Sequence, residues 1–232
     1  MLIVSLFDFT GNAGRPWAEA GHQVLCLDIL HKGFTVESFE GGGAIVYQSA
    51  DLSNRAWVEI VARMSPGMIF SFPPCTDLAV SGALWFASKE RKNPGTRERA
   101  MALVYQCRDI GEAAGCPYYI ENPVSVISTE WRQSDYRWNP CDFSGYLPEG
   151  DKHPRHPDIL PERDRYNKKT CVWVGGGWAL PPRRYIKPID EKGVSPILKK
   201  LGGNSNRTKS IRSETPRGFS LACFLDYQNK DT

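Results

Sequence analysis

The stretch Phe70–Phe86, FSFPPCTDLAVSGALWF, decides how the rest of the chain is interpreted. The apolar run Met68–Phe72 is typical of a buried strand. The two prolines that follow end it, because they lack N–H donors and have fixed φ angles. Cys75 comes next, on an expected rigid turn at the carboxyl end of a strand, where open α/β sheets bind their ligands. Position alone leaves two interpretations open, a reactive thiol or a small buried hydrophobic residue.

The composition is that of a soluble globular chain of one domain, or of one domain with a small appendage. It has 232 residues, 41% of them hydrophobic and 24% charged, and a net charge of +3 that is too small to identify a nucleic-acid binder. Seven scattered cysteines and the lack of an apolar leader predict free thiols in a reducing cytoplasm. No run is long and apolar enough to span a membrane.

The first thirty residues or so have the pattern of a nucleoside-binding βαβ unit. An apolar strand over residues 1–7 is followed by a turn that contains Gly11, a helix over 16–20 and a strand over 24–29 with Asp28 near its end. Small residues let a ligand approach the backbone, and a carboxylate accepts hydrogen bonds from ribose hydroxyls. The turn does not match GxGxxG, so the pattern predicts an adenosine-containing ligand without specifying a dinucleotide.

Further strands are predicted over 44–48, 117–120 and 169–174, and helices over 55–64 and 96–114. This alternation predicts a doubly wound α/β fold with a mostly parallel sheet. Polar side chains then stand at four strand ends: Asp8 or Thr10, Asp28, Cys75 and Glu121. Their convergence on one sheet edge is the argument for a site.

A thiol, a carboxylate and a nucleoside pocket together favour one chemistry. A cysteine thiolate adds to C6 of a cytosine ring while a carboxyl group hydrogen-bonds N3 and the exocyclic amine. C5 then becomes nucleophilic enough to take a methyl group from S-adenosylmethionine.

The ordered motifs resemble those of a known family. They are Leu6–Gly11, Pro16-Trp17, Asp28, Asp51, Pro74-Cys75, Glu121-Asn122, Lys168-Lys169-Thr170 and Thr215–Phe219. In this order they resemble the cytosine-C5 DNA methyltransferases, most of all the short versions found in bacteriophages and prophages, over nearly the whole chain.

The resemblance implies a Rossmann-like S-adenosylmethionine-dependent methyltransferase fold, and DNA as the partner, with its cytosine flipped out. The expected catalytic residues are Cys75, Glu121, Asn122 and Lys169. The expected cofactor-binding residues are Phe7, Thr10, Gly11, Asp28, Ile29, Asp51, Leu52 and Pro73. The expected substrate-binding residues are Pro74, Thr76, Lys168 and Thr170. We expect a monomer in the cytoplasm of a bacterial host cell.

Three segments follow from this interpretation. Residues 1–128 are the expected cofactor-binding and catalytic core, and residues 129–170 a small irregular insertion. Residues 171–232 are expected to hold a strand, a reduced target-recognition loop and a C-terminal helix that packs back on the core. The tract 79–94 is predicted as a loop that closes over the substrate rather than a helix capped by Thr76 or Asp77, and 204–215 as a mobile polar tract.

The sequence also departs from the family. Ser5 stands where Asp is usual, Phe9 where Gly is usual, Thr76 where Gln is usual and Pro123 where Val is usual. The segment between Val174 and Thr215 is short for a target-recognition domain, which predicts modest sequence selectivity or recognition by the loop 131–166.

Two other functions stay open. The same chemistry could act on a free cytidine nucleotide, which explains the short recognition segment. A catalytically silent homologue could bind DNA or a host protein. Cys141, His153, His156 and Cys171 form a weak zinc pattern without a CxxC pair, so no metal site is predicted.

Overall fold

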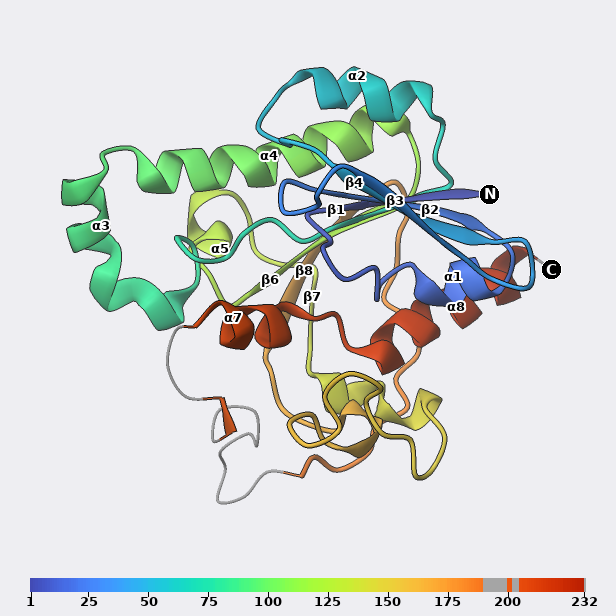
Figure 1. Ribbon diagram of the computed structural model, residues 1–232. Helices are drawn as coiled ribbons and strands as arrows, with labels where there is room; N and C mark the ends of the chain where they lie inside the picture. The colour runs from blue at the N-terminus through green and yellow to red at the C-terminus, as the bar shows by residue number, and fades with distance from the viewer. Residues whose placement is uncertain (190–199, 202–204, 232) are drawn as a thin grey trace. The chain divides into compact units, whose positions relative to one another are not determined.

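An eight-stranded mixed sheet organises the computed structural model of the protein, which describes residues 1–189, 200–201 and 205–231 (Figure 1). The strands are β1 (Leu2–Leu6), β2 (Gln23–Asp28), β3 (Phe34–Ser38), β4 (Ala44–Ser49), β5 (Met68–Ser71), β6 (Tyr118–Pro123), β7 (Tyr136–Trp138) and β8 (Thr170–Gly175). Their order across the sheet is β3-β4-β2-β1-β5-β6-β8-β7.

The centre of the sheet is parallel. β1 pairs in parallel with both β2 and β5, β2 with β4, and β5 with β6, whereas β3 and β8 run antiparallel to β4 and β6. The strand order reverses at β1, since the chain goes from β1 to β2 on one side and later returns to β5 on the other. The mostly parallel α/β sheet predicted from the sequence is confirmed. Ligands in such sheets bind at the carboxyl ends of the strands beside this reversal.

Three helices cover the two faces of the sheet. α1 (Arg15–Glu19) lies on one face, and α2 (Ala56–Arg63) and α4 (Thr96–Ala114) lie together on the other (Figure 1). The predicted helix over 96–114 is confirmed at both ends, because Gly95 and Gly115 adopt the left-handed φ values of 77° and 65° at its two caps.

The core lies between the sheet and these helices. Val104, Cys107 and Ile110 form the inner stripe of α4 and are fully buried, and they pack in one cluster with Ile69 of β5 and Ile120 of β6. Each such large apolar side chain contributes roughly 1.5–3 kcal/mol to folding. The two strands that carry the candidate site are therefore fixed by this buried core.

Two local expectations differ from the structure, and one strand was not expected. The tract 79–94 is not a loop, since it forms the short 3₁₀ helix η1 (Val80–Trp85) and α3 (Phe86–Lys92), and no side chain caps η1. In the described part of 204–215 the chain forms α7 (Asn206–Ser213), in which Ser205 caps the N–H of Thr208. β3 was not predicted; Phe34 and Val36 alternate with polar residues in it, but both side chains are exposed at the sheet edge.

The chain divides into two compact units. The first comprises Met1–Arg137 with Thr170–Ala179, and the second Trp138–Lys169 with Leu180–Thr232. α5 (Ile127–Glu130) belongs to the first unit. The second contains the 3₁₀ turns η2 (Pro140–Asp142), η3 (Ser144–Tyr146) and η4 (Glu162–Asp164), and the helices α7 and α8 (Arg217–Asp231).

The second unit has its own small core, which joins the predicted insertion to the C-terminal helix. Phe219 of α8 stacks on Trp138 with ring centroids 4.2 Å apart and also contacts Phe143. Arg217 forms ion pairs of 2.6 Å with Asp151 and 2.9 Å with Asp164. In the described residues no helix has both the length and the apolar character needed to cross a membrane.

Candidate active site

Cys75 lies on an exposed turn directly after β5. Pro73 is buried and Pro74 exposed, and the carbonyl oxygen of Cys75 accepts the N–H groups of Leu78 (3.0 Å) and Ala79 (2.8 Å). The thiol therefore stands at the start of a closed turn, at the carboxyl end of a strand, as predicted.

Cys75 differs from the other cysteines by its exposure. The remaining cysteines are buried: Cys26, Cys107, Cys116, Cys141, Cys171 and Cys223. Burial raises the pKa of Cys107 to about 12 and that of Cys116 to about 11, so these thiols stay protonated at neutral pH. The interpretation of Cys75 as a buried hydrophobic residue is wrong.

Glu121 and Asn122 lie on the neighbouring strand, at the same end of the sheet. The parallel pairing aligns Ser71 of β5 with Ile120 of β6, so Glu121 lies one residue beyond the last aligned pair. The side-chain Nδ2 of Asn122 donates a hydrogen bond of 2.9 Å to the carbonyl oxygen of Pro73, and both groups are buried. This bond joins the Pro73–Cys75 turn to the Glu121 strand.

We expect Asn122→Ala to loosen this junction. The substitution leaves the buried Pro73 carbonyl without a donor, which costs about 1–3 kcal/mol. Urea unfolding should show the loss as a lower midpoint. Asn93→Ala, at an exposed position after α3, is the control and should change stability by less than about 0.5 kcal/mol. An Asn122→Ala protein as stable as the wild type would show that the bond does not hold the turn.

Asp8 shapes the loop that follows β1. Its Oδ1 accepts hydrogen bonds from the N–H of Thr10 (2.9 Å), the hydroxyl of Thr10 (3.0 Å) and the N–H of Gly11 (2.8 Å). Its Oδ2 accepts the Ser5 hydroxyl (2.8 Å). The sequence analysis left Asp8 or Thr10 as the polar group at this strand end. Asp8 folds the loop, a role that its residue type favours.

The same loop makes close approach to the backbone possible. Phe7 and Gly11 both have positive φ, 58° and 69°. A Cβ on Gly11 would lie 2.5 Å from the hydroxyl oxygen of Tyr47, and the left-handed φ itself favours glycine at this position. Strained backbone of this kind is concentrated at functional sites.

Asp28 ends β2 beside this loop and is buried, while Ile29 after it is 64% exposed. Burial raises the pKa of Asp28, and its Oδ1 accepts the N–H of Leu30 (2.8 Å). Its Oδ2 accepts no hydrogen bond within the described residues. One oxygen of the Asp28 carboxylate is held by a hydrogen bond, and the other can accept hydrogen bonds from a ribose diol. The exposed Ile29 side chain beside it can contact the face of a purine base.

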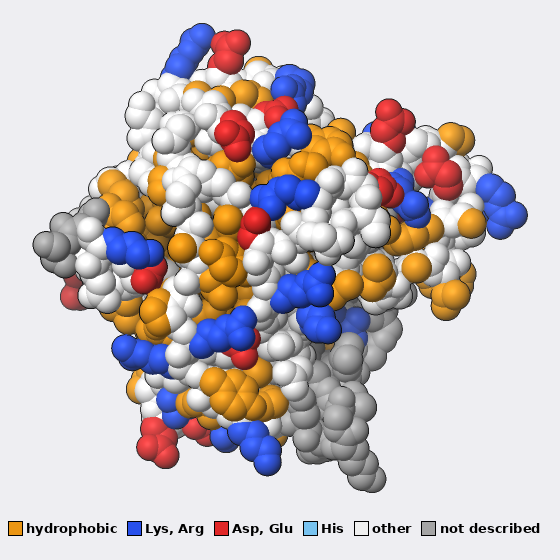
Figure 2. Space-filling view, turned by 180° about the vertical axis from the view of Figure 1, so that it is seen from behind, with side chains coloured by type: hydrophobic (Ala, Val, Ile, Leu, Met, Phe, Trp, Pro, Cys, Tyr) orange, Lys and Arg blue, Asp and Glu red, His pale blue; other side chains and the backbone are white. Residues whose placement is uncertain are grey.

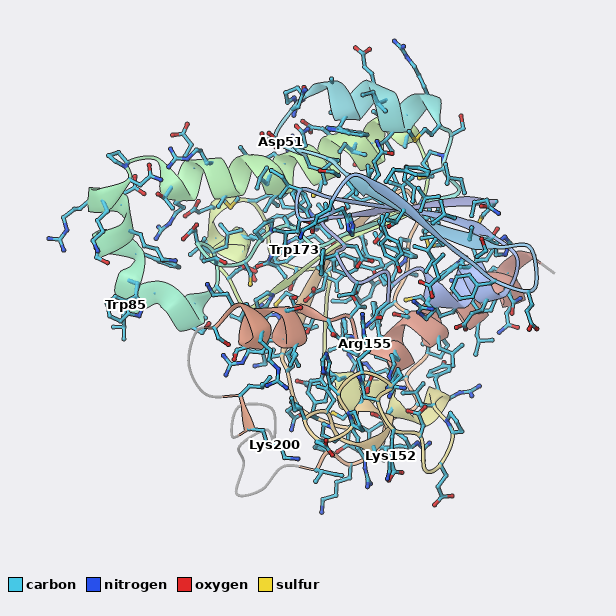
Figure 3. All side chains as sticks on the ribbon, viewed as in Figure 1. Asp51, Trp85, Lys152, Arg155, Trp173 and Lys200 are labelled. Atoms are coloured by element: carbon cyan, nitrogen blue, oxygen red, sulfur yellow. The ribbon has the colours of Figure 1, made fainter. Side chains whose placement is uncertain are left out.

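Asp51 lies on the loop from β4 to α2 and is exposed (Figure 3). Its Oδ1 accepts hydrogen bonds from the hydroxyl (2.7 Å) and the N–H (3.0 Å) of Ser53, which lower its pKa. Leu52 is buried in the core, so its backbone is the part that can face a ligand.

A hollow of about 570 Å³ lies next to the Cys75 turn. Its lining joins three segments: Pro74 and Asp77 after β5, Ser53 after Asp51, and the face of α4 with Leu103 and Gln106. Its size is within the range of small-molecule sites. The α4 residues were not predicted, because a helical stripe in the sequence indicates packing and not which turn borders a hollow.

The basic motif is divided between the two units. Thr170 begins β8 and pairs with Pro123, at the end of the sheet that carries Glu121, and it is buried. Lys168 and Lys169 precede it and belong to the second unit. Lys169 is exposed, whereas the Lys168 ammonium donates to the carbonyl oxygen of Arg212 (2.8 Å).

The residues of the weak zinc pattern have other surroundings. Cys171 lies in β8 of the first unit, and Cys141 contacts Asn167 in the second. The two histidines converge on buried Glu214, with His153 Nε2 at 3.2 Å and His156 Nε2 at 3.1 Å. His153 Nδ1 accepts the N–H of His156 (3.0 Å), so its Nε2 must carry the proton that it shares with Glu214.

This cluster predicts a pH dependence. Burial by itself raises the pKa of Glu214, but the hydrogen bond from His153 and the charge of Arg155 more than offset it, so the pKa is lowered. A lowered pKa means that the charged form stabilises the fold above pH 4.5, the ordinary value, and that this part is lost as the pH falls below it.

We therefore expect Glu214→Gln to weaken the fold at pH 7 by about 1–3 kcal/mol and to flatten the acid limb of the stability curve. Chemical unfolding between neutral and acidic pH measures both. If the free energy of unfolding fell equally steeply with pH in Glu214→Gln and the wild type below pH 4.5, the charge of Glu214 would not be the cause.

No protein-family model matches the sequence, and a search of curated proteins gives no significant match.

Proposed function

We propose that the protein transfers a methyl group from S-adenosylmethionine to C5 of cytosine in DNA through a covalent adduct with Cys75. The observation that carries the proposal is the buried hydrogen bond from Asn122 to the Pro73 carbonyl. It joins the turn of the exposed cysteine to β6, the strand that carries Glu121. The proposal also rests on the ordered motifs of the sequence, read together with the mostly parallel sheet.

In this proposal the catalytic side chains divide the work at the cytosine ring. The Cys75 thiolate forms a bond to C6, and electron density moves toward N3 and C5. Glu121 hydrogen-bonds N3 and the exocyclic amine, which stabilises the charge that develops on the ring. Once C5 carries the methyl group it loses its proton to a base, and the C6–S bond breaks to release the thiolate. Asn122 acts as a positioning residue through Pro73.

The carboxyl edge beside β1 fits the cofactor. When bound, S-adenosylmethionine supplies an electrophilic methyl group. Asp28 would hold the ribose, Ile29 would contact the adenine face, and the Thr10–Gly11 backbone would border the amino-acid end. Phe7, Asp51, Leu52 and Pro73 complete the proposed cofactor set. The glycine-favouring geometry at Gly11 and the open Oδ2 of Asp28 support this assignment.

The substrate-binding residues are assigned from the sequence motifs around Cys75 and before β8. Pro74 and Thr76 flank Cys75 and are exposed, and they are proposed to contact the base. Lys169 directly precedes β8 and is proposed to contact the base or its phosphate, with Lys168 and Thr170 supporting it. The proposed setting is a monomer that acts on DNA in the cytoplasm of a bacterial host.

Labelled methyl transfer tests the proposal and separates its two substrates. The purified protein is incubated with radiolabelled S-adenosylmethionine and either duplex DNA or dCMP, and the products are digested to nucleosides. We expect label in 5-methyldeoxycytidine from the duplex. Label from dCMP alone would assign the nucleotide as substrate, and no label from either, with no cofactor binding by calorimetry, would favour a silent homologue.

A further inference from the structure

β3 lies at one edge of the sheet, and among the strands that the structure describes it pairs with β4 alone (Figure 1). Backbone hydrogen bonds at its two ends show which of its residues face β4. The N–H of Ser49 donates to the carbonyl oxygen of Gly33 (2.8 Å), and the N–H of Phe39 donates to that of Gly43 (2.9 Å). Because the residues that bond to a neighbour alternate along an antiparallel strand, the odd-numbered residues from 33 to 39 face β4.

The backbone groups of Phe34, Val36 and Ser38 consequently point away from the sheet. Within the described residues, nothing forms a hydrogen bond with their outward N–H and C=O groups. The side chains of Phe34 and Val36 are 65% and 51% exposed on one face of the strand. Hydrophobic side chains reach the surface elsewhere too (Figure 2), so exposure alone does not identify a contact surface. Exposure beside a free row of backbone donors and acceptors does, because such an edge is a template for another strand.

The sequence of β3 is complementary to a second copy of itself. If two β3 strands pair antiparallel about Val36, this residue lies opposite Val36 of the second copy, and Phe34 lies opposite Ser38. Every pair then joins residues whose backbone groups point outward, so each pair can exchange two hydrogen bonds. The apolar side chains of Phe34 and Val36 fall on the same face and cover each other diagonally across the two strands.

Charge favours this register over the adjacent ones. Pairing about Glu37 would place two carboxylates opposite each other, which is unfavourable, and pairing about Thr35 brings no opposite charges together. Pairing about Val36 places Lys32, just before β3, at the same end as Glu40 of the second copy. Symmetry repeats this ion pair at the other end. Both side chains are exposed, and neither forms an ion pair with a residue that the structure describes.

We propose that β3 is a self-association surface, at which two copies of this chain pair their β3 strands antiparallel about Val36 and continue the sheet. The interface is small, so the association is reversible and needs high protein concentration. The proposed methyl transfer requires one copy only, because every residue assigned to it comes from one chain. The two proposals are therefore independent of each other.

Analytical ultracentrifugation of the full chain, without cofactor or DNA, tests the pairing. We expect the average mass to rise from that of a monomer toward that of a dimer as the concentration increases to about 0.5 mM. Val36→Pro should abolish the rise, because proline removes an outward N–H that the second copy needs. An edge strand tolerates proline where that N–H faces solvent. Val36→Ala keeps the N–H and should retain part of the rise.

A charge exchange tests the register. Lys32→Glu and Glu40→Lys should each weaken dimerisation several-fold, because like charges then meet at both ends of the paired strands. The protein with both substitutions should regain most of the wild-type association. Lys92→Glu, at an exposed position in α3, makes the same change of charge and should leave the association unaltered.

A protein that stays monomeric at every concentration overturns the proposal, and so does association that Val36→Pro leaves unchanged. Single charge variants that associate as well as the wild type, or a double variant that does not recover, overturn the register about Val36. Far-UV circular dichroism checks that each variant is folded. If Val36→Pro does not fold, the charge exchange decides.

Discussion

Replacing Cys75 with serine is expected to lower methyl transfer to cytosine by roughly 10⁴-fold or more, because a serine hydroxyl is a far weaker nucleophile than a thiolate at neutral pH. The side chain is exposed, so the fold and cofactor binding should be unchanged. Labelled transfer measures the first effect, and calorimetry and thermal unfolding measure the others.

Cys116→Ser is the matched control. Cys116 is buried just before β6, at the opposite end of the strand from Glu121. The substitution removes a thiol and some stability but leaves the proposed site intact, so the folded protein should transfer methyl at the wild-type rate. If Cys75→Ser transferred methyl at the wild-type rate, Cys75 would not be the nucleophile.

Replacing Glu121 with glutamine is expected to lower the transfer rate by about 10²–10⁴-fold. Glutamine keeps the size of the side chain but removes the negative charge, and it cannot bind N3 and the amine in the same manner as a carboxyl group. Its position in β6, with Oε1 shielded from solvent, lets that charge act strongly. Single-turnover rates give the chemical step directly.

The control for charge is Glu59→Gln, on the exposed surface of α2. It changes the net charge by the same amount and should leave the rate unchanged. Cofactor affinity should be the same in all three proteins, because Glu121 is assigned to the base and not to the cofactor. If Glu121→Gln kept the wild-type single-turnover rate, the Glu121 carboxylate would have no role in the chemical step.

Features with local causes could be predicted from the sequence. The helix over 96–114 is bounded by glycines whose left-handed φ values define both of its ends. The strands around Cys75 and Glu121 begin as short apolar runs, so their presence and order could be predicted. The carboxyl end of β6 could not, because the strand continues through Glu121 and Asn122 to Pro123 and does not stop at residue 120.

Features that depend on distant contacts could not be predicted. The bond from Asn122 to Pro73 joins residues 49 positions apart, and no local pattern specifies it. The segment of η1 and α3 was predicted as a loop that closes over the substrate. The structure instead forms two short helices there, and neither buries a side chain, so no apolar stripe marks them. Lys89 fixes this segment through a long-range pair with Asp77.

The hollow beside α4 illustrates the same limit within the site. Ser53, Pro74 and Leu103 come from three separate segments. The sequence marks Leu103 as part of a helical stripe, and only the packing of α4 against the neighbouring segments determines that this turn borders the hollow.

The most direct test of the central claim is covalent trapping at Cys75. A fluorine at C5 of cytosine cannot leave as a cation, so the step that releases the thiolate is blocked and the adduct accumulates. With S-adenosylmethionine and duplex DNA that contains 5-fluorodeoxycytidine, we predict a denaturation-resistant protein–DNA complex whose digest places the nucleobase on Cys75. Cys75→Ser should give none. A wild-type protein that binds both ligands yet forms no adduct, or forms it on another residue, would contradict the mechanism.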